Sequence, residues 1–168
     1  MLHKNIFSQD NNQIIIVSNL KNATKATLTF YDKNNKILET EAFIGKNGMT
    51  NDKKEGDGKT PEGIFDLGVF FGTHNKEDIG LNENVQYIRI NKNLYWVDDK
   101  HSKYYNQLVD ITQVRKDWNT AEHLIEYPKQ YEYAIEIKTN SKNIPGNRKC
   151  DIFTLQCKQT NSRLYCNR

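Results

Sequence analysis

Residues 26–43 read ATLTFYDKNNKILETEAF, two runs of alternating apolar and polar side chains separated by the polar turn DKNN. Such alternation is typical of a strand with one buried face, and Thr and aromatic residues favour strands. Asp and Asn are common in tight turns because their short side chains hydrogen-bond the nearby backbone. We therefore predict a β-hairpin, with strands at 26–31 and 36–43.

Further short strands are predicted on both sides of this hairpin. The run QIIIVS at 13–18 is compact and apolar, and other strand-like runs lie at 64–70, 86–90, 94–97 and 133–138. The best candidate for a short helical or turn element is DWNTAEHLI at 117–125. The sum predicts a mainly β protein, of the β-rich α+β class.

The bulk composition is that of one ordinary folded domain. The chain has 168 residues, 36% of them hydrophobic, with a mean hydropathy of −0.83. No run approaches the roughly 18 apolar residues that span a membrane, and residues 1–12 lack the apolar centre of a signal peptide. We expect an N-terminal extension at 1–12 and a domain at 13–147. Without an export signal, the chain as printed is expected to be cytoplasmic or truncated at its start.

Residues 148–168 differ in composition from the rest of the chain. They hold five of the 24 basic residues but one of the 21 acidic ones, so residues 1–147 carry a net charge of −1. A neutral body without a basic stripe gives no support to nucleic-acid binding. All three cysteines, Cys150, Cys157 and Cys166, also lie in this tail. Without C-x-x-C or a nearby His a zinc site is disfavoured, and the alternative is a tail read from another frame.

The segment DKKEGDGKTPEG at 52–63 concentrates turn-forming residues, with Gly56, Gly58, Pro61 and Gly63 close together. Its Gly and Lys faintly resemble a phosphate loop, but the spacing is not G-x-x-x-x-G-K-[ST]. Its two nearby acids, Glu55 and Asp57, are too few for an EF-type calcium loop. Spacing alone favours a tight turn in which Gly adopts positive φ and Pro fixes the exit.

Two other groups of residues could carry chemistry. His123 is a lone histidine, and such residues are more often packed or solvent-facing than catalytic. Tyr95 and Trp96 precede the carboxylates of Asp98 and Asp99, which could border a sugar or peptide groove. A strand that ends in an acidic turn explains the same pattern equally well. The residues alone therefore predict a soluble β domain of open function.

One string gives a more specific indication. EGDGKTPEGIFDLG at 55–68 is very similar to the motif that opens the catalytic domain of one subfamily of L,D-transpeptidases, the YkuD-type cysteine transpeptidases. The resemblance covers about residues 13–147. The further matches, in chain order, are Phe71 and Gly72; 95–99 with Ser102, Tyr105 and Asn106; Trp118 with 121–124; 131–137; and Pro145 with Gly146.

The resemblance implies a β-sandwich domain with a groove, and acyl transfer between peptidoglycan stem peptides through a Cys thiolate aided by a His. A thiolate attacks a carbonyl readily, and a neighbouring His keeps it deprotonated. It further implies no cofactor, no metal, no nucleic-acid partner, a monomer, and a location at the cell wall outside the cytoplasmic membrane. The motif and groove residues implied are Glu55, Gly56, Asp57, Gly58, Lys59, Thr60, Pro61, Gly63, Tyr95, Trp96, Asp98, Asp99, Trp118, Glu122 and His123.

The chain departs from the family pattern in its tail. In this subfamily the His lies in a segment like GSAIFLH and the Cys in a following TAGC-type segment, and neither string is present. Deleting one T from the codon for Asn147, in one synonymous back-translation, yields GKGSAIFLHCSANKQTAGCIAI. We therefore expect 148–168 to be read out of frame, with Thr154 and Leu164 at the positions of the family His and Cys.

Several expectations follow from this departure. The domain should be truncated at its C-terminal end and inactive, and the segment after Gly146 should pack poorly. Cys166 is a weak substitute nucleophile, for which His123 would have to serve as the partner. A non-catalytic peptidoglycan-binding β domain is the alternative function. An unrelated soluble β protein is disfavoured by the match at 55–68.

Overall fold

The computed structural model describes residues 3–9, 12–18, 24–32, 34–54, 56–81, 85–145, 151–155, 157–160 and 163–166. Its regular elements are strands, with one short 3-10 helix among the described residues, which confirms the mainly β class. Within the described part of the chain, no helix is long and apolar enough to cross a membrane.

The first sheet has the order β4-β3-β2-β1-β7. Its strands are β1 (His3–Gln9), β2 (Asn12–Ser18), β3 (Lys25–Asp32), β4 (Asn35–Phe43) and β7 (Ile64–Phe65). The predicted hairpin is confirmed, since β3 and β4 pair antiparallel up to Asp32 and Asn35. Strand β1 was not predicted. It pairs antiparallel with β2 along its whole length and parallel with β7.

The central sheet has the order β14-β13-β8-β9. Its strands are β8 (Leu67–Gly72), β9 (Tyr87–Arg89), β13 (Tyr133–Ile137) and β14 (Asp151–Leu155). The single strand expected at 64–70 is divided, because 64–65 pairs with β1 and 67–72 pairs with β13. The chain therefore passes at Asp66 from the first sheet to the central sheet.

The third sheet has the order β11-β10-β12, formed by β10 (Leu94–Val97), β11 (Gln107–Asp110) and β12 (Ala121–His123). A 3-10 helix, η1 (Leu124–Glu126), follows β12 directly. The segment 117–125, expected as a short helical or turn element, is irregular at 117–120, forms a strand paired with β10 at 121–123, and enters the 3-10 helix at Leu124. Two short pairs complete the structure, β5 (Met49–Thr50) with β6 (Thr60–Pro61) and β15 (Cys157–Thr160) with β16 (Arg163–Cys166).

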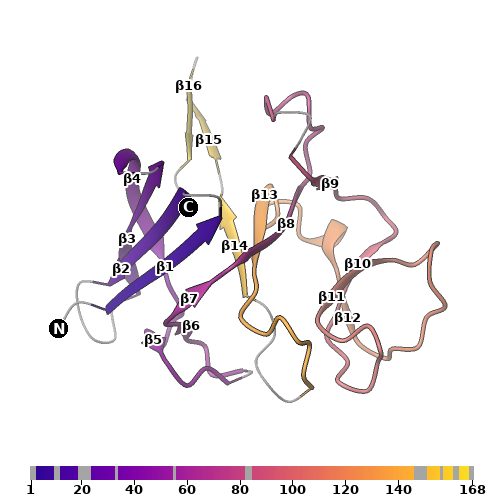
Figure 1. Cartoon of the computed structure of the whole chain (residues 1–168). Helices are drawn as coiled ribbons and strands as arrows, with labels where there is room; N and C mark the ends of the chain where they lie inside the picture. The colour runs from indigo at the N-terminus through magenta and orange to yellow at the C-terminus, as the bar shows by residue number, and fades with distance from the viewer. Residues whose placement is uncertain are drawn as a thin grey trace.

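The central sheet is packed on both faces (Figure 1). Its Leu67 and Ile137 contact Leu28 and Ala42 of the first sheet. Its opposite face carries Phe71 and Ala134, which pack with residues from the third sheet and η1, including Trp96 and Leu124. Alternating side chains of a strand point to opposite faces, so one sheet serves two cores.

Strand β14 corrects one expectation about the tail. The segment after Gly146 was expected to pack poorly, yet 151–155 pairs with β13 along all five residues and Ile152 packs against the core around Phe71. Strand pairing relies on backbone groups that every residue supplies, so a short run can complete a sheet without a matched set of side chains.

Candidate functional site

The loop at 56–63 is organised around the carboxylate of Asp57. This carboxylate accepts hydrogen bonds from the backbone N–H of Lys54 at 2.8 Å and of Lys59 at 2.9 Å, and pairs with the Lys53 ammonium at 2.6 Å. Partial burial raises the pKa of Asp57, but the bonds from Lys53, Lys54 and Lys59 outweigh it and lower the pKa to about 2. The carboxylate is therefore engaged within its own loop.

The same loop is fastened to the preceding turn at 45–48. The Asn47 N–H donates to the Gly58 carbonyl at 2.9 Å, and the Gly45 N–H donates to the Thr60 hydroxyl at 2.8 Å. Gly56 and Gly58 adopt φ of 77° and 65°, which a side chain would strain. Of the three interpretations of this motif, the geometry matches the tight turn. Glu55 lies outside the described residues.

His123 lies on the third sheet with both ring nitrogens engaged. Its ring stacks on Tyr95 with centroids 4.2 Å apart, Nδ1 lies 3.0 Å from a Glu126 oxygen, and Nε2 lies 2.9 Å from the Lys92 carbonyl. Cys166 belongs to β16, which Figure 1 places far across the molecule from β12. The arrangement therefore does not support His123 as a partner for Cys166.

Several other predicted groove residues in and around the third sheet make contacts within the fold. Asp99 accepts hydrogen bonds from the N–H groups of Asn119 at 2.7 Å and His101 at 2.9 Å, which lower its pKa. Trp118 is buried in a core on the outer face of this sheet. Glu122 accepts the hydroxyl of Tyr131 at 2.7 Å, and Asp98 is half-buried. These contacts hold the β10–β12 unit together.

A pocket of about 310 Å³ opens where the central and third sheets meet. Its apolar wall is formed by Val69, Trp96 and Leu108, and its polar groups include Asn106, Glu136 and Lys138. Trp96 is thus the one predicted groove residue among those that line this pocket.

The polar side of the pocket is held by hydrogen bonds. The side chain of Asn106, itself buried at a positive φ of 62°, donates to the Asn143 side-chain oxygen at 2.9 Å. A Glu136 oxygen accepts the backbone N–H of Val69 at 3.1 Å. A Cβ on Gly68 would overlap the Glu136 carboxylate, so glycine there leaves the space that this side chain occupies. The Glu136 carboxylate is therefore fixed before any ligand arrives.

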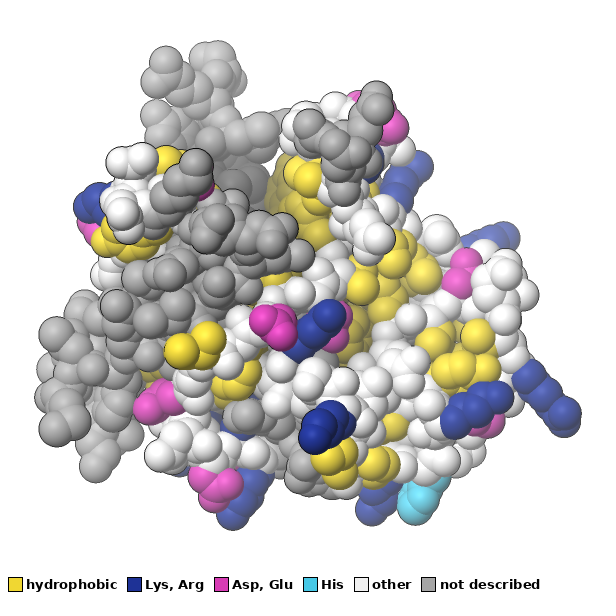
Figure 2. Space-filling view, viewed as in Figure 1, with side chains coloured by type: hydrophobic (Ala, Val, Ile, Leu, Met, Phe, Trp, Pro, Cys, Tyr) yellow, Lys and Arg dark blue, Asp and Glu magenta, His cyan; other side chains and the backbone are white. Residues whose placement is uncertain are grey.

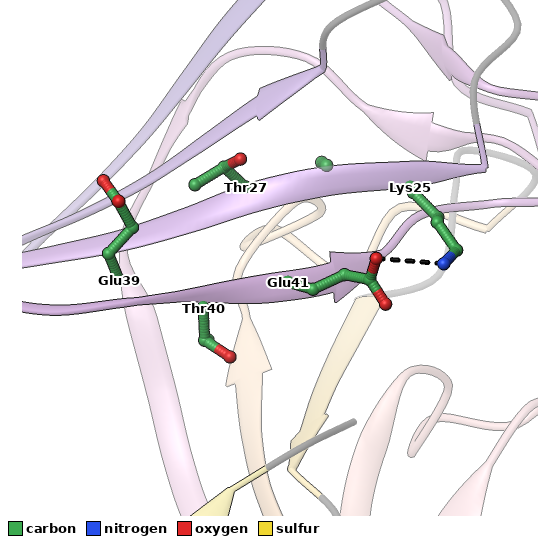
Figure 3. Close-up of a pocket in the computed structure, with 6 residues that line it drawn as sticks. Lys25, Thr27, Glu39, Thr40 and Glu41 are labelled. Carbon is green, nitrogen blue, oxygen red and sulfur yellow. Dashed lines mark hydrogen bonds and ion pairs between the residues drawn. The ribbon is translucent and has the colours of Figure 1, made fainter.

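Two other surface features lie away from this pocket. A hollow of about 430 Å³ crosses β3 and β4, where Lys25 and Glu41 reach toward each other at 2.9 Å (Figure 3). Hydrophobic side chains also gather in a hollow over β8 and β13 (Figure 2). Aromatic contacts made by these strands include Phe70 of β8 with Tyr87 of β9, and Tyr133 of β13 with His74. Neither feature includes a cysteine among its described residues.

Comparison with known proteins decides the family. A family model described as the L,D-transpeptidase catalytic domain (YkuD) matches residues 12–141, well over half of the chain. The chain belongs to the L,D-transpeptidase catalytic domain family. No curated protein and no solved structure matches.

Within this L,D-transpeptidase domain, the position expected for the family His lies close to the pocket. Thr154 on β14 pairs with Ala134, and Ile152 pairs with Glu136. Residues paired directly across a ladder share a face, so Thr154, Ala134, Ile152 and Glu136 all lie on the face that packs toward Trp96. Leu164, the position expected for the family Cys, lies in β16, which belongs to a separate two-stranded sheet.

Sequence reasoning missed the charged residues of the pocket. Glu136 and Lys138 lie in the run AIEIK at 134–138, which was interpreted only as a strand. The overlooked signal is the alternation itself, because it places Glu136 on the face shared with the buried Ala134, and Lys138 follows just past the end of β13. Charged residues on the inner face of a central strand are uncommon unless they are paired or used.

Proposed function

We propose that this chain derives from an enzyme that transfers acyl groups between peptidoglycan stem peptides, and that it keeps a binding face but not the catalytic pair. The observation that carries the proposal is the placement of Thr154. That residue lies on the pocket side of the central sheet, where the family resemblance expects the catalytic His. By family, such a domain would act at the cell wall.

The two replaced residues cannot perform the chemistry. Acyl transfer through a thiolate requires a nucleophilic sulfur, a base that holds it deprotonated, and donors for the developing oxyanion. The hydroxyl of Thr154 is a poor base near neutral pH, and the Leu164 side chain has no nucleophilic atom. We therefore expect this chain to show neither transpeptidase nor carboxypeptidase activity on tetrapeptide substrates.

A shift of reading frame near codon 147 accounts for the replacement. The tail differs from the body in charge and in cysteine content, and one deleted nucleotide restores both family segments in a back-translation. The nucleotide sequence across codons 144–168 tests this directly. It should contain, in an alternative frame, a GSAIFLH-like segment followed by a TAGC-like segment. A message that lacks these strings in both alternative frames would refute the shift.

The loss of activity is tested by covalent labelling. The purified chain and a frame-restored, C-terminally extended version are incubated with a carbapenem-type acylating agent, and adduct mass is measured. The restored protein should acylate rapidly and the present chain only slowly, through exposed thiols. Cys166→Ala in the present chain is the control. Rapid stoichiometric acylation that disappears in this variant would make Cys166 a nucleophile and overturn the proposal.

A non-catalytic binding role is the second candidate, and the preformed pocket at Trp96 and Glu136 favours it. Binding does not require the missing nucleophile. Co-sedimentation of the chain with purified peptidoglycan tests this role. Retention above that of an unrelated protein of similar charge supports it, and equal recovery in the supernatant excludes it.

A further inference from the structure

We infer that the pocket between the central and third sheets binds the end of a small molecule or peptide that carries an ammonium and a carboxylate together, as an amino-acid zwitterion does. The ammonium would lie at Glu136 and the carboxylate at Lys138, both of which line the pocket. This inference deepens the proposed function by naming the group recognised, but it concerns binding alone and does not depend on catalysis.

The spacing of the two charges fits such a ligand. Glu136 lies on the inner face of β13, and Lys138 follows two residues later, just past the end of the strand, so their Cα atoms are about 7 Å apart. Among the described side chains, the Lys138 ammonium forms no ion pair, and it lines the pocket together with Glu136. A zwitterion placed between the two side chains would meet an opposite charge at each end.

The opposite signs also select against singly charged ligands. A lone anion at Lys138 would be repelled by Glu136 over nearly the same distance, and a lone cation at Glu136 would be repelled by Lys138. For a singly charged ligand, attraction to one side chain and repulsion from the other largely cancel. For a zwitterion, each end is attracted to the side chain of opposite charge. The pocket thus favours the ligand that satisfies both residues at once.

The volume of the pocket and its apolar walls limit the size and polarity of the rest of the ligand. A volume of about 310 Å³ has room for about ten water molecules at about 30 Å³ each, which suits a group of amino-acid size. Val69, Trp96 and Leu108 offer apolar surface to a short aliphatic part. Because the Val69 N–H already orients Glu136, little side-chain ordering remains to oppose binding there.

The pocket lies close to the position at which the family resemblance expects the catalytic His. Thr154 lies two residues along β14 from Ile152, which pairs directly with Glu136. A ligand end held at Glu136 would therefore lie about 7 Å along the strand direction from the position expected for the family His. A stem peptide anchored by its zwitterionic end at this point could extend toward that position.

The test uses the full chain labelled with ¹⁵N and titrated with D- and L-alanine, alanine methyl ester and N-acetylalanine, observed by NMR. The chain has two tryptophans, and only Trp96 lines the pocket, whereas Trp118 packs on the outer face of the third sheet. At least one form of alanine should shift the Trp96 indole signal saturably and leave that of Trp118 in place. The ester and the N-acetyl form, which each lack one charge, should bind about tenfold more weakly.

Two variants assign the charges. Glu136→Gln keeps an oxygen for the Val69 N–H but should weaken alanine binding about tenfold and abolish the preference for alanine over N-acetylalanine. Lys138→Gln should weaken it about fivefold and abolish the preference for alanine over its ester, the smaller loss reflecting the exposure of Lys138. Glu77→Gln and Lys142→Gln, exposed and outside the pocket, make the same charge changes as controls.

Two outcomes overturn the inference. One is that no form of alanine shifts the Trp96 signal saturably, and the other is that alanine, its ester and its N-acetyl form bind alike. Either result would leave the acylation experiment on the frame-restored protein unaffected, because that experiment detects the nucleophile. The two proposals can therefore fail separately.

Discussion

Replacing Asp57 by Asn should destabilise the fold in a pH-dependent way. The ordinary pKa of 3.8 is lowered to about 2 in the folded chain, and about 1.36 kcal/mol per unit makes the ionised carboxylate worth about 2.5 kcal/mol at neutral pH. Because the folded pKa is the lower one, this stabilisation is present above about pH 4 and is lost as the pH falls through about 2. Roughly half should be gone at pH 3.

The assay is urea unfolding of the chain and of Asp57→Asn at a series of pH values. Asp52→Asn is a matched control, because Asp52 lies in the same loop but is largely exposed and pairs with Lys54 at 3.4 Å. The control should change stability by less than about 1 kcal/mol. The reasoning is refuted if the two variants are equally stable at pH 7, or if the loss in Asp57→Asn is the same at pH 3 as at pH 7.

Two further substitutions test the packing around the site. Gly68→Ala should lower the free energy of unfolding by about 1–3 kcal/mol, because its Cβ overlaps the Glu136 carboxylate, and a thermal melt that does not move would contradict this. Tyr131→Phe should cost about 1–3 kcal/mol, since it removes the hydroxyl that Glu122 accepts at 2.7 Å, and urea unfolding measures the loss. Unchanged stability in Tyr131→Phe would mean that Glu122 finds another donor.

Local patterns predicted about half of the strands, because alternation directly reports one buried face. The hairpin of β3 and β4 and strand β10 were found within a residue or two of their observed ends. Strand β12 was missed as a strand because three residues are too few to establish a period, and its conformation is set by pairing with β10. Strand β1 was missed because its run lies beside a polar turn and before the expected domain start.

The candidate site was less predictable than the fold. The motif at 55–68 indicated the family. Its Asp57 nevertheless accepts hydrogen bonds from its own loop, so this family-specific sequence forms a structural turn. The pocket requires Val69, Asn106 and Glu136 to meet from three separate strands or turns. Such a meeting depends on how the central and third sheets pack, which no local period encodes.

Strand β14 separates what pairing requires from what chemistry requires. Its backbone pairs with β13 along 151–155, and backbone groups would do so with many different side chains. Completion of the sheet and the chemistry of the site thus depend on different atoms of the same strand. A substitution on β14 could remove a reactive side chain and still leave the β13–β14 ladder in place.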